Sequence, residues 1–327
     1  MKKYIKILCA VLCVVLTASV FFACTGANSG SDTITVGIIQ YASHPSLDNC
    51  REGVIKGLQN AGYKDGENIK IDYQNAANSD ETANQIAKNM VAKNYDIIIS
   101  IATPAATAAY SAARGTGVPV IFCAVSDPVA AKLVPSMDKA GDNCTGTSDL
   151  LNLEAQLKLI RACQPDAKKI GIIYTTSEAN SVSHLEEIKA LAPKYGFEIV
   201  AKGIQSPADI PQTAAMLAGE VDCINNFTDN NVVDNLGTVL EKANAAGIPV
   251  YGSEIEQVKN GCLASESLDY VALGEQTGAM AAKVLSGTDI STMPVERVKD
   301  SFPVINTTVA EKFSVSLTGY DNIEKVS

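Results

Sequence analysis

Four carboxylates stand directly after short apolar runs of this sequence, where a strand would end and a loop begin: Asp127, Glu178, Asp229 and Glu254. No Lys or Arg occurs in these short segments, and a site with net negative charge favours a cationic group on its ligand. A further segment has Thr103 and Pro104 at the positions of an N-cap and a first helical residue. Backbone N–H groups at such a helix start favour an anion such as a carboxylate. The two features together predict a site for a zwitterion, and a free amino acid satisfies both.

Other polar side chains follow the same apolar runs and join the candidate set for ligand binding. They are Gln40, Tyr41, His44, Ser126, Asn180, Ser181 and Asn230. Tyr41 and His44 have flat rings that could sandwich a planar ligand, although an isolated histidine is more often a capping or packing residue. Each segment taken alone also fits ordinary turn and N-cap chemistry. Their shared position at the ends of apolar runs favours the binding role.

Motifs for catalysis and metal binding are absent from the sequence. It has no GxSxG elbow, no phosphate-binding GxxxxGK[ST] loop and no GxGxxG after an apolar run. Six of the nine cysteines follow the first 24 residues, and none has a CxxC or zinc-like spacing: Cys50, Cys123, Cys144, Cys163, Cys223 and Cys262. We expect them to be small buried side chains. We therefore expect that the protein is not an enzyme and that it binds no cofactor and no metal. The alternative, a surface enzyme on the same scaffold, would need a reactive pair of side chains that the sequence does not show.

Val- and Ile-rich runs alternate with helical patterns along the chain. The expected strands are residues 33–40, 69–73, 96–100, 118–122, 169–174, 198–203, 222–226 and 248–251. Between them, residues recur at helical spacing, as Leu185, Ile188 and Leu191 do. Near-continuous apolar strands that each precede a helix indicate parallel sheets covered on both faces. The expected fold class is therefore doubly wound α/β.

The order of these runs repeats within the chain. The stretches VGII, YDII and GVPV are echoed in the same order by IGII, VDCI and GIPV, at residues 36–39, 95–98, 117–120, 170–173, 221–224 and 247–250. Three echoes in register predict two similar lobes, joined near residues 146–150. Ligands of open parallel sheets bind beyond the carboxyl ends of the strands. We therefore expect the two lobes to enclose a ligand cleft that closes about a hinge.

The charge of the chain and its first residues restrict where it works. The 327 residues contain 26 Lys and Arg against 36 Asp and Glu, a formal net charge of −10, which argues against nucleic-acid binding. Lys2, Lys3 and Lys6 precede an uncharged apolar stretch at residues 7–23, a pattern typical of a secretory leader. The following Phe-Phe-Ala-Cys resembles a bacterial lipobox. We expect residues 1–23 to be a lipoprotein signal peptide, Cys24 to be lipidated, with palmitate among the acyl chains, and residues 24–32 to include the tether.

Several longer stretches together resemble the substrate-binding lipoproteins of bacterial ABC importers, in the tryptophan/tyrosine-type branch: VGIIQYASHPSLDNCREG, IATPAATAA, IFCAVSDPVAAKLV, NCTGTSDL, IGIIYTTSEANS and FTDNNVV. The resemblance covers about residues 33–308. It implies a type I periplasmic-binding fold with three hinge crossings. The implied lobes are residues 33–147 with about 267–290, and residues 148–266 with about 291–320. It also implies a monomer on the extracytoplasmic face of the cell membrane, with a membrane permease as its partner.

For the site, the same resemblance implies an aromatic amino acid as the ligand. The implied contacts are a carboxylate cradle (Thr103, Pro104, Ala105), two acids near the α-amino group (Asp127, Asp229), two rings beside the side chain (Tyr41, His44), three residues that close from the second lobe (Glu178, Asn180, Ser181) and two more in the matching stretches (Thr147, Tyr174). Alternatives stay open. The scaffold could bind a branched-chain amino acid, a nucleobase or a sugar, although the chain has no Trp for a sugar to stack on. It could also act as a ligand sensor.

Overall fold

The computed structural model describes residues 33–298, 300–315, 320 and 322–327. The expected signal peptide, the lipidated Cys24 and the tether lie outside these residues and stay predictions. Residues 34–327 form one compact unit. In the part of the chain that the structure describes, no helix combines the length and the apolar character needed to cross a membrane.

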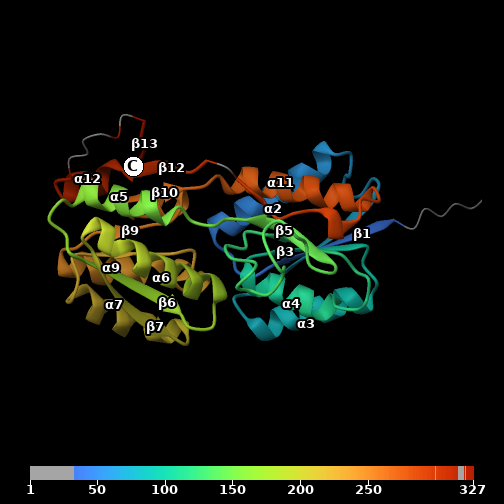
Figure 1. Ribbon diagram of the computed structural model, residues 1–327, viewed down its shortest axis with the longest axis horizontal. Helices are drawn as coiled ribbons and strands as arrows, with labels where there is room; N and C mark the ends of the chain where they lie inside the picture. Colours follow the sequence, from blue (N-terminus) through green and yellow to red (C-terminus); the bar gives the residue numbers. More distant parts are fainter. Residues whose placement is uncertain (1–32, 299, 316–319, 321) are drawn as a thin grey trace, which may run out of the picture. The chain divides into compact units, whose positions relative to one another are not determined.

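The first half of this unit is built on a parallel sheet with the order β11-β5-β4-β3-β1-β2. Its strands are β1 (Ile34–Gln40), β2 (Ile69–Asn75), β3 (Ile97–Ile101), β4 (Val120–Cys123), β5 (Cys144–Ser148) and β11 (Glu296–Arg297). Helices α2 (Pro45–Asn60) and α11 (Tyr270–Leu285) lie on one face, and α3 (Asp80–Ala92) and α4 (Thr103–Ala113) lie on the other (Figure 1). Every residue of β3, β4 and β5 is buried, as expected for strands covered on both faces.

The second half contains a parallel sheet with the order β7-β6-β8-β9 and a smaller sheet with the order β10-β12-β13. The strands are β6 (Lys169–Thr175), β7 (Glu198–Ile204), β8 (Cys223–Asn225), β9 (Val250–Tyr251), β10 (Ala264–Ser267), β12 (Phe302–Asn306) and β13 (Glu324–Val326). The helices are α5 (Leu153–Cys163), α6 (Ala179–Leu191), α7 (Ile210–Ala218), α8 (Asn230–Asp234), α9 (Leu236–Ala246), α10 (Ile255–Lys259) and α12 (Thr307–Lys312), with single turns η1 (Ala192–Tyr195) and η2 (Pro207–Asp209). The turn η3 (Ile290–Thr292) lies in the first half, between α11 and β11.

The two parallel sheets have the same internal order. In the first, β1 lies between β2 and β3, and β4 follows; in the second, β6 lies between β7 and β8, and β9 follows. The echoed stretches VGII and IGII lie in β1 and β6, the equivalent central strands. The predicted α/β class with two similar doubly wound halves is therefore confirmed, and all eight expected strands are present.

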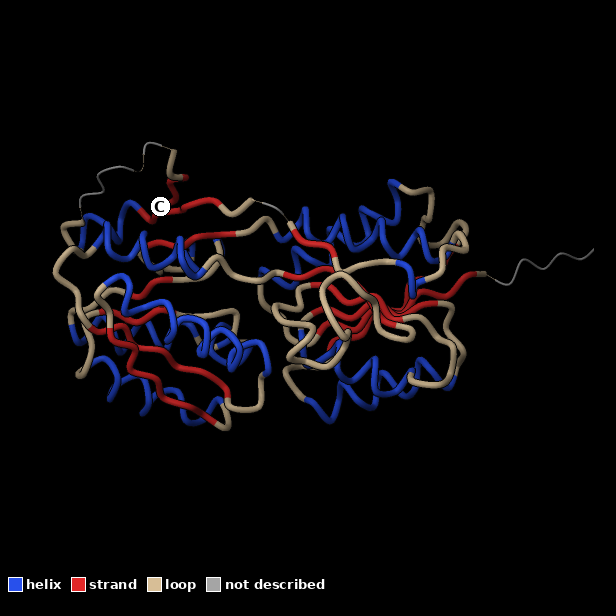
Figure 2. Tube along the Cα trace, viewed as in Figure 1, coloured by secondary structure: helices blue, strands red, loops and turns tan. Residues whose placement is uncertain are grey.

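The chain passes between the two halves after β5, after β10 and after β11 (Figure 2). β11 pairs with β5 in the first sheet, whereas β12 pairs with β10 in the second half. The last passage therefore follows Arg297, and the expected boundary near residue 290 is wrong by several residues. The sequence gives little sign of this passage because β11 is only two residues long.

Helices α2 and α11 approach each other closely, backbone against backbone. A Cβ added to Gly53 would lie 2.2 Å from the carbonyl oxygen of Val271, and one added to Gly274 would lie 2.2 Å from that of Cys50. A Cβ on Gly57 would similarly lie 2.3 Å from the carbonyl oxygen of Glu275. Only glycine permits this approach. It fixes the carboxyl-terminal helix α11 against the first half of the chain.

The six cysteines from Cys50 to Cys262 are all buried and free. Their thiols lie within apolar surroundings, such as β4 for Cys123 and β8 for Cys223. The expectation of small buried side chains is confirmed for these six positions.

Candidate functional site

A cavity lies between the two halves of the chain, beyond the carboxyl ends of their parallel strands. Its wall combines polar and apolar side chains from both halves: His44, Ser46, Leu47, Ala102, Thr103, Ala124, Ser126, Asp149 and Tyr270 from one side, and Asn180, Thr228, Asn230, Val233, Glu254 and Gln257 from the other. This position is where open parallel sheets bind their ligands.

Two helices begin at this cavity without a side-chain cap. The N-cap of α2 is His44, with Pro45 as the first helical residue, and the N-cap of α4 is Ala102. Thr103 was expected to be the N-cap of the second helix, but it is already the first helical residue. The first-turn N–H groups of a helix have no intrahelical partner. These two helix starts therefore supply a site for an anionic group.

The backbone is strained at two positions in the cavity wall. Ala102 has φ 79° and ψ 154°, and Ala124 has φ 55°, although neither is glycine. Each follows the end of a central strand, β3 or β4. Strained residues of this kind persist where the surrounding structure holds them, and they cluster at ligand sites. Here they turn the chain from each strand into the wall of the cavity.

Asp149 is the buried carboxylate of the first half, directly after β5. Its Oδ1 accepts a hydrogen bond from the Ser126 hydroxyl at 2.9 Å, and its Oδ2 accepts one from the Tyr270 hydroxyl at 2.8 Å. Burial raises the pKa of this carboxyl, and the two hydroxyl donors lower it only partly. Among the described residues that line the cavity, none is Lys or Arg. A cation from the ligand would therefore be the missing counter-charge.

Glu254 is the buried carboxylate of the second half. It caps α10 by accepting hydrogen bonds from the backbone N–H groups of Glu256 and Gln257, at 2.6 and 2.9 Å. Burial raises its pKa to about 7, and the two backbone donors oppose that rise. The cavity thus has an acidic group on each side.

Several polar atoms in the cavity wall are buried and have no hydrogen-bond partner among the described residues. They are His44 Nδ1, Ser46 Oγ, Asn180 Oδ1, Thr228 Oγ1 and Gln257 Oε1. Buried polar groups are normally paired, and an unpaired one costs roughly 1–3 kcal/mol. So many in one wall point to a polar ligand that pairs them.

Hydrogen bonds join the two halves around the cavity. Asn78 Nδ2 donates to Asn231 Oδ1 at 2.8 Å, and the Ser183 hydroxyl donates to Asp127 Oδ2. His44 Nε2 lies 3.5 Å from Asn230 Oδ1. Of these contacts, the one between His44 and Asn230 joins two residues that line the cavity.

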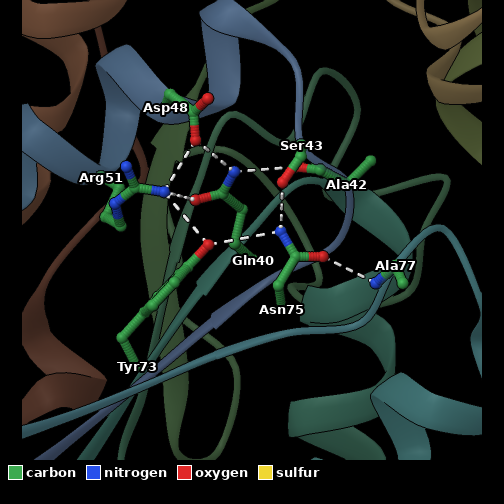
Figure 3. Close-up of polar contacts among 8 residues, drawn as sticks. All are labelled: Gln40, Ala42, Ser43, Asp48, Arg51, Tyr73, Asn75 and Ala77. Atoms are coloured by element: carbon green, nitrogen blue, oxygen red, sulfur yellow. Dashed lines mark hydrogen bonds and ion pairs between the residues drawn. The ribbon is translucent and has the colours of Figure 1, made fainter.

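A hydrogen-bond network holds the loop that leads from β1 into α2 (Figure 3). Gln40 Nε2 donates to the Ala42 carbonyl at 2.7 Å and to Asp48 Oδ1 at 2.9 Å, while Arg51 donates to Gln40 Oε1 at 2.7 Å. Asn75 Nδ2 donates to the Ser43 hydroxyl at 2.9 Å. All of the Gln40 amide is thus engaged within the first half. It supports the loop before His44 and does not line the cavity.

The structure brings together some of the sequence candidates and separates others. Six line the cavity: His44, Thr103, Ser126, Asn180, Asn230 and Glu254. Three line an adjoining cleft: Tyr41, Pro104 and Glu178. The others line neither: Gln40, Ala105, Asp127, Thr147, Tyr174, Ser181 and Asp229. Asp229, for example, caps α8 and accepts hydrogen bonds from Thr175 and Ser181.

Sequence reasoning missed nine residues of the wall: Ser46, Leu47, Ala102, Ala124, Asp149, Thr228, Val233, Gln257 and Tyr270. Ser46 and Leu47 lie in the first turn of α2, and Ala102 is the N-cap of α4. Including every residue at each expected helix start would have found these three. Asp149 was missed because the strand before it was not expected. Tyr270 begins α11, and only the return of the chain to the first half brings it to the cavity.

The buried ionisable groups of the wall predict a pH-dependent stability. Glu254 has a raised pKa, so its contribution to stability is fully present below its ordinary pKa of about 4.5 and is lost as the pH rises to about 7. Glu254→Gln removes this titration. The unfolding free energy of the variant relative to the wild type is expected to rise by about 3 kcal/mol between pH 4.5 and 7.5. Urea denaturation across this range measures it.

Glu186→Gln is the matched control for that titration, because Glu186 is exposed on α6. Its unfolding free energy should stay within about 0.5 kcal/mol of the wild type, as for an exposed surface substitution. A flat difference for Glu254→Gln as well would contradict the raised pKa. A difference that rises with pH from a non-zero starting value would not, because the variant also loses one acceptor of the helix cap.

A cavity of polar and apolar side chains between two parallel α/β halves, with acidic groups and two helix starts in its wall, defines a protein that binds a small solute. The model of the family described as ABC transporter substrate binding protein matches residues 35–325. The chain belongs to this family. Its fold is the type I periplasmic-binding fold, and substrate-binding proteins of ABC transporters work outside the cytoplasm.

Related proteins fit this assignment. The chain is 38% identical to a tyrosine-binding protein of Clostridioides difficile (strain R20291), over all of this chain and 97% of the relative. A structure of an ABC domain from Streptococcus pneumonia in complex with L-Trp has a TM-score of 0.86 and 34% identity, covering 90% of this chain and all of the other. A ligand-free, open substrate-binding protein from Clostridium difficile has 38% identity but a TM-score of 0.69, covering 90% of this chain and 99% of the other. The structure thus matches the ligand-bound relative better than the open one.

Proposed function

We propose that this chain binds a free aromatic amino acid in the cavity and delivers it to the permease of an ABC importer. One observation carries the proposal: Asp149, a buried carboxylate with no cationic neighbour in the described wall, faces the same cavity as two uncapped helix starts. An α-ammonium group pairs with Asp149, and an α-carboxylate pairs with the free N–H groups of a helix start.

The arrangement orients the ligand. The α-ammonium group binds Asp149, which Ser126 and Tyr270 hold in place. The α-carboxylate binds the N–H groups at the start of α4, beside Thr103. The side chain then extends toward the start of α2 and the second half of the wall. The names of the relatives, one tyrosine-binding and one in complex with L-Trp, support an aromatic side chain.

The rest of the proposal concerns the setting in which the protein works. The basic and apolar first 23 residues support export, and the Cys24 motif supports a lipid anchor on the outer face of the cell membrane. A monomer tethered in this way closes its two halves on the ligand and presents the closed form to the permease. Closure is favoured only by the additional contacts that the ligand makes in the closed form.

A thermal-shift screen of the full chain tests the proposed ligand class. L-Tyr or L-Trp at about 100 times its dissociation constant is expected to stabilise the folded state by about 2.7 kcal/mol. The D-enantiomers are the matched controls, because they carry the same groups with the wrong geometry at the α-carbon. Stabilisation by sugars, nucleobases or branched-chain amino acids alone would contradict the proposal.

A further inference from the structure

Asn230 has a fixed orientation in the cavity wall because Glu178 holds it. Glu178 Oε2 accepts hydrogen bonds from the Asn230 backbone N–H at 3.2 Å and from its Nδ2 at 2.8 Å. Glu178 is itself buried, and Asn180 Nδ2 also donates to it. The amide nitrogen of Asn230 thus points toward Glu178. Its oxygen Oδ1 is left to face His44 in the other half.

This orientation determines which nitrogen of His44 carries a proton. Nε2 of His44 lies 3.5 Å from Asn230 Oδ1, and a carbonyl oxygen only accepts hydrogen bonds. On this contact we assign the ring proton to Nε2. The ring is also neutral, because burial lowers the pKa of His44 to about 4. In a neutral imidazole the second nitrogen has a free lone pair, so Nδ1 is a hydrogen-bond acceptor.

Nδ1 of His44 is buried and has no partner among the described residues. Two further acceptors of the wall share this condition. Gln257 donates its amide to the Phe227 carbonyl at 3.3 Å, which leaves its Oε1 unpaired. Asn180 donates to Glu178 and Thr228, which leaves its Oδ1 unpaired. These three residues, which line the cavity from both halves, therefore present acceptors, and a ligand that pairs with them must bring donors.

We propose that His44 is a specificity-determining residue whose Nδ1 accepts a hydrogen bond from the ring donor of the ligand, the phenolic O–H of tyrosine or the indole N–H of tryptophan. This inference rests on the proposed function. Asp149 takes the α-ammonium group, since a carboxylate is the stronger acceptor for a cation. The ring donor is then the group left for His44. A ligand without that donor leaves the buried acceptor unpaired, which is why such sites reject close analogues.

Calorimetry with two ligand pairs tests the inference on the full chain. Each pair differs by one donor: L-Tyr against L-Phe, and L-Trp against its benzothiophene analogue, which has sulfur in place of the indole N–H. We expect at least one donor ligand to bind the wild type about tenfold or more tightly than its partner. In His44→Phe that ratio is expected to fall to about threefold or less.

His184→Phe is the matched control, because His184 is fully buried against Phe227 and does not line the cavity. It should keep the wild-type ratio. An unchanged ratio in His44→Phe, or equal weakening of both members of a pair, overturns the inference and leaves the proposed function standing. Failure of the wild type to bind any aromatic amino acid overturns the proposed function, and the inference with it.

The tautomer of His44 provides a second readout that needs no variant. Long-range proton–nitrogen spectra of the liganded protein distinguish a protonated from an unprotonated ring nitrogen. We expect Nε2 to be protonated and Nδ1 to have the shift of a hydrogen-bonded lone pair. A proton on Nδ1 would overturn the inference, because Nδ1 would then be a donor.

Discussion

Asp149→Asn is expected to weaken binding of the aromatic amino acid by about 100-fold or more. The substitution keeps the shape of the side chain but removes the charge that pairs with the α-ammonium group. Truncating one partner of a buried charge pair typically costs about 2–5 kcal/mol, because the other charge is left buried and uncompensated. The unliganded protein should be at least as stable as the wild type. Burial raises the pKa of Asp149, so its charge is unfavourable until a cation arrives.

Calorimetry that compares the ligand affinities of Asp149→Asn and Asp127→Asn tests which carboxylate binds the ammonium group. The family resemblance implied that Asp127 and Asp229 lie near the ammonium group. In the structure Asp127 is half-buried, accepts hydrogen bonds from the Ala130 N–H and the Ser183 hydroxyl, and does not line the cavity. Asp127→Asn should therefore bind the ligand more tightly than Asp149→Asn does. It loses only the contact with Ser183 between the two halves. The reverse order of affinities would show that the ammonium group binds at Asp127.

Asp149 was not predicted as a site residue because the strand that precedes it has no apolar pattern. The strand β5 has the sequence Cys-Thr-Gly-Thr-Ser, which lacks the Val and Ile of the strands that were expected. Its polar side chains are nevertheless buried, since Thr145 donates to the Met293 carbonyl and Thr147 bonds the Thr277 hydroxyl. Both partners lie more than a hundred residues away in the chain. Local hydropathy therefore cannot predict that these polar side chains are buried in a strand.

The rule that ligands bind beyond strand ends worked where the strands were apolar. It placed Thr103 after β3, Ser126 after β4 and Glu254 after β9, and all three line the cavity. The same rule does not tell a residue that faces the cavity from one that holds the loop. Gln40 and Asp229 also follow strands, but their hydrogen bonds are taken by the protein. Only the partners of a side chain, which the fold decides, separate the two cases.

Gly274→Ala is expected to lower the unfolding free energy by about 3 kcal/mol and the melting temperature by roughly 5–10 °C. A Cβ at this position would lie 2.2 Å from the Cys50 carbonyl oxygen and 2.9 Å from the Cα of Gly53. Both are backbone atoms of α2, so no side chain can rotate away. The two helices must separate, and the buried surface around them is partly lost. Alanine would otherwise favour the helix by up to about 1 kcal/mol, so the loss runs against intrinsic propensity.

Gly237→Ala is the matched control, because Gly237 lies in helix α9 with nothing within 4 Å of the added Cβ. Its melting temperature should stay the same or rise. Equal melting temperatures for the two variants would contradict the close approach of α2 and α11. The contact also bears on the site, since α11 begins with Tyr270, which holds Asp149, and α2 begins beside His44. Separation of these helices displaces both ends of the ligand site. The rise in melting temperature that the ligand produces should therefore shrink in Gly274→Ala and persist in Gly237→Ala.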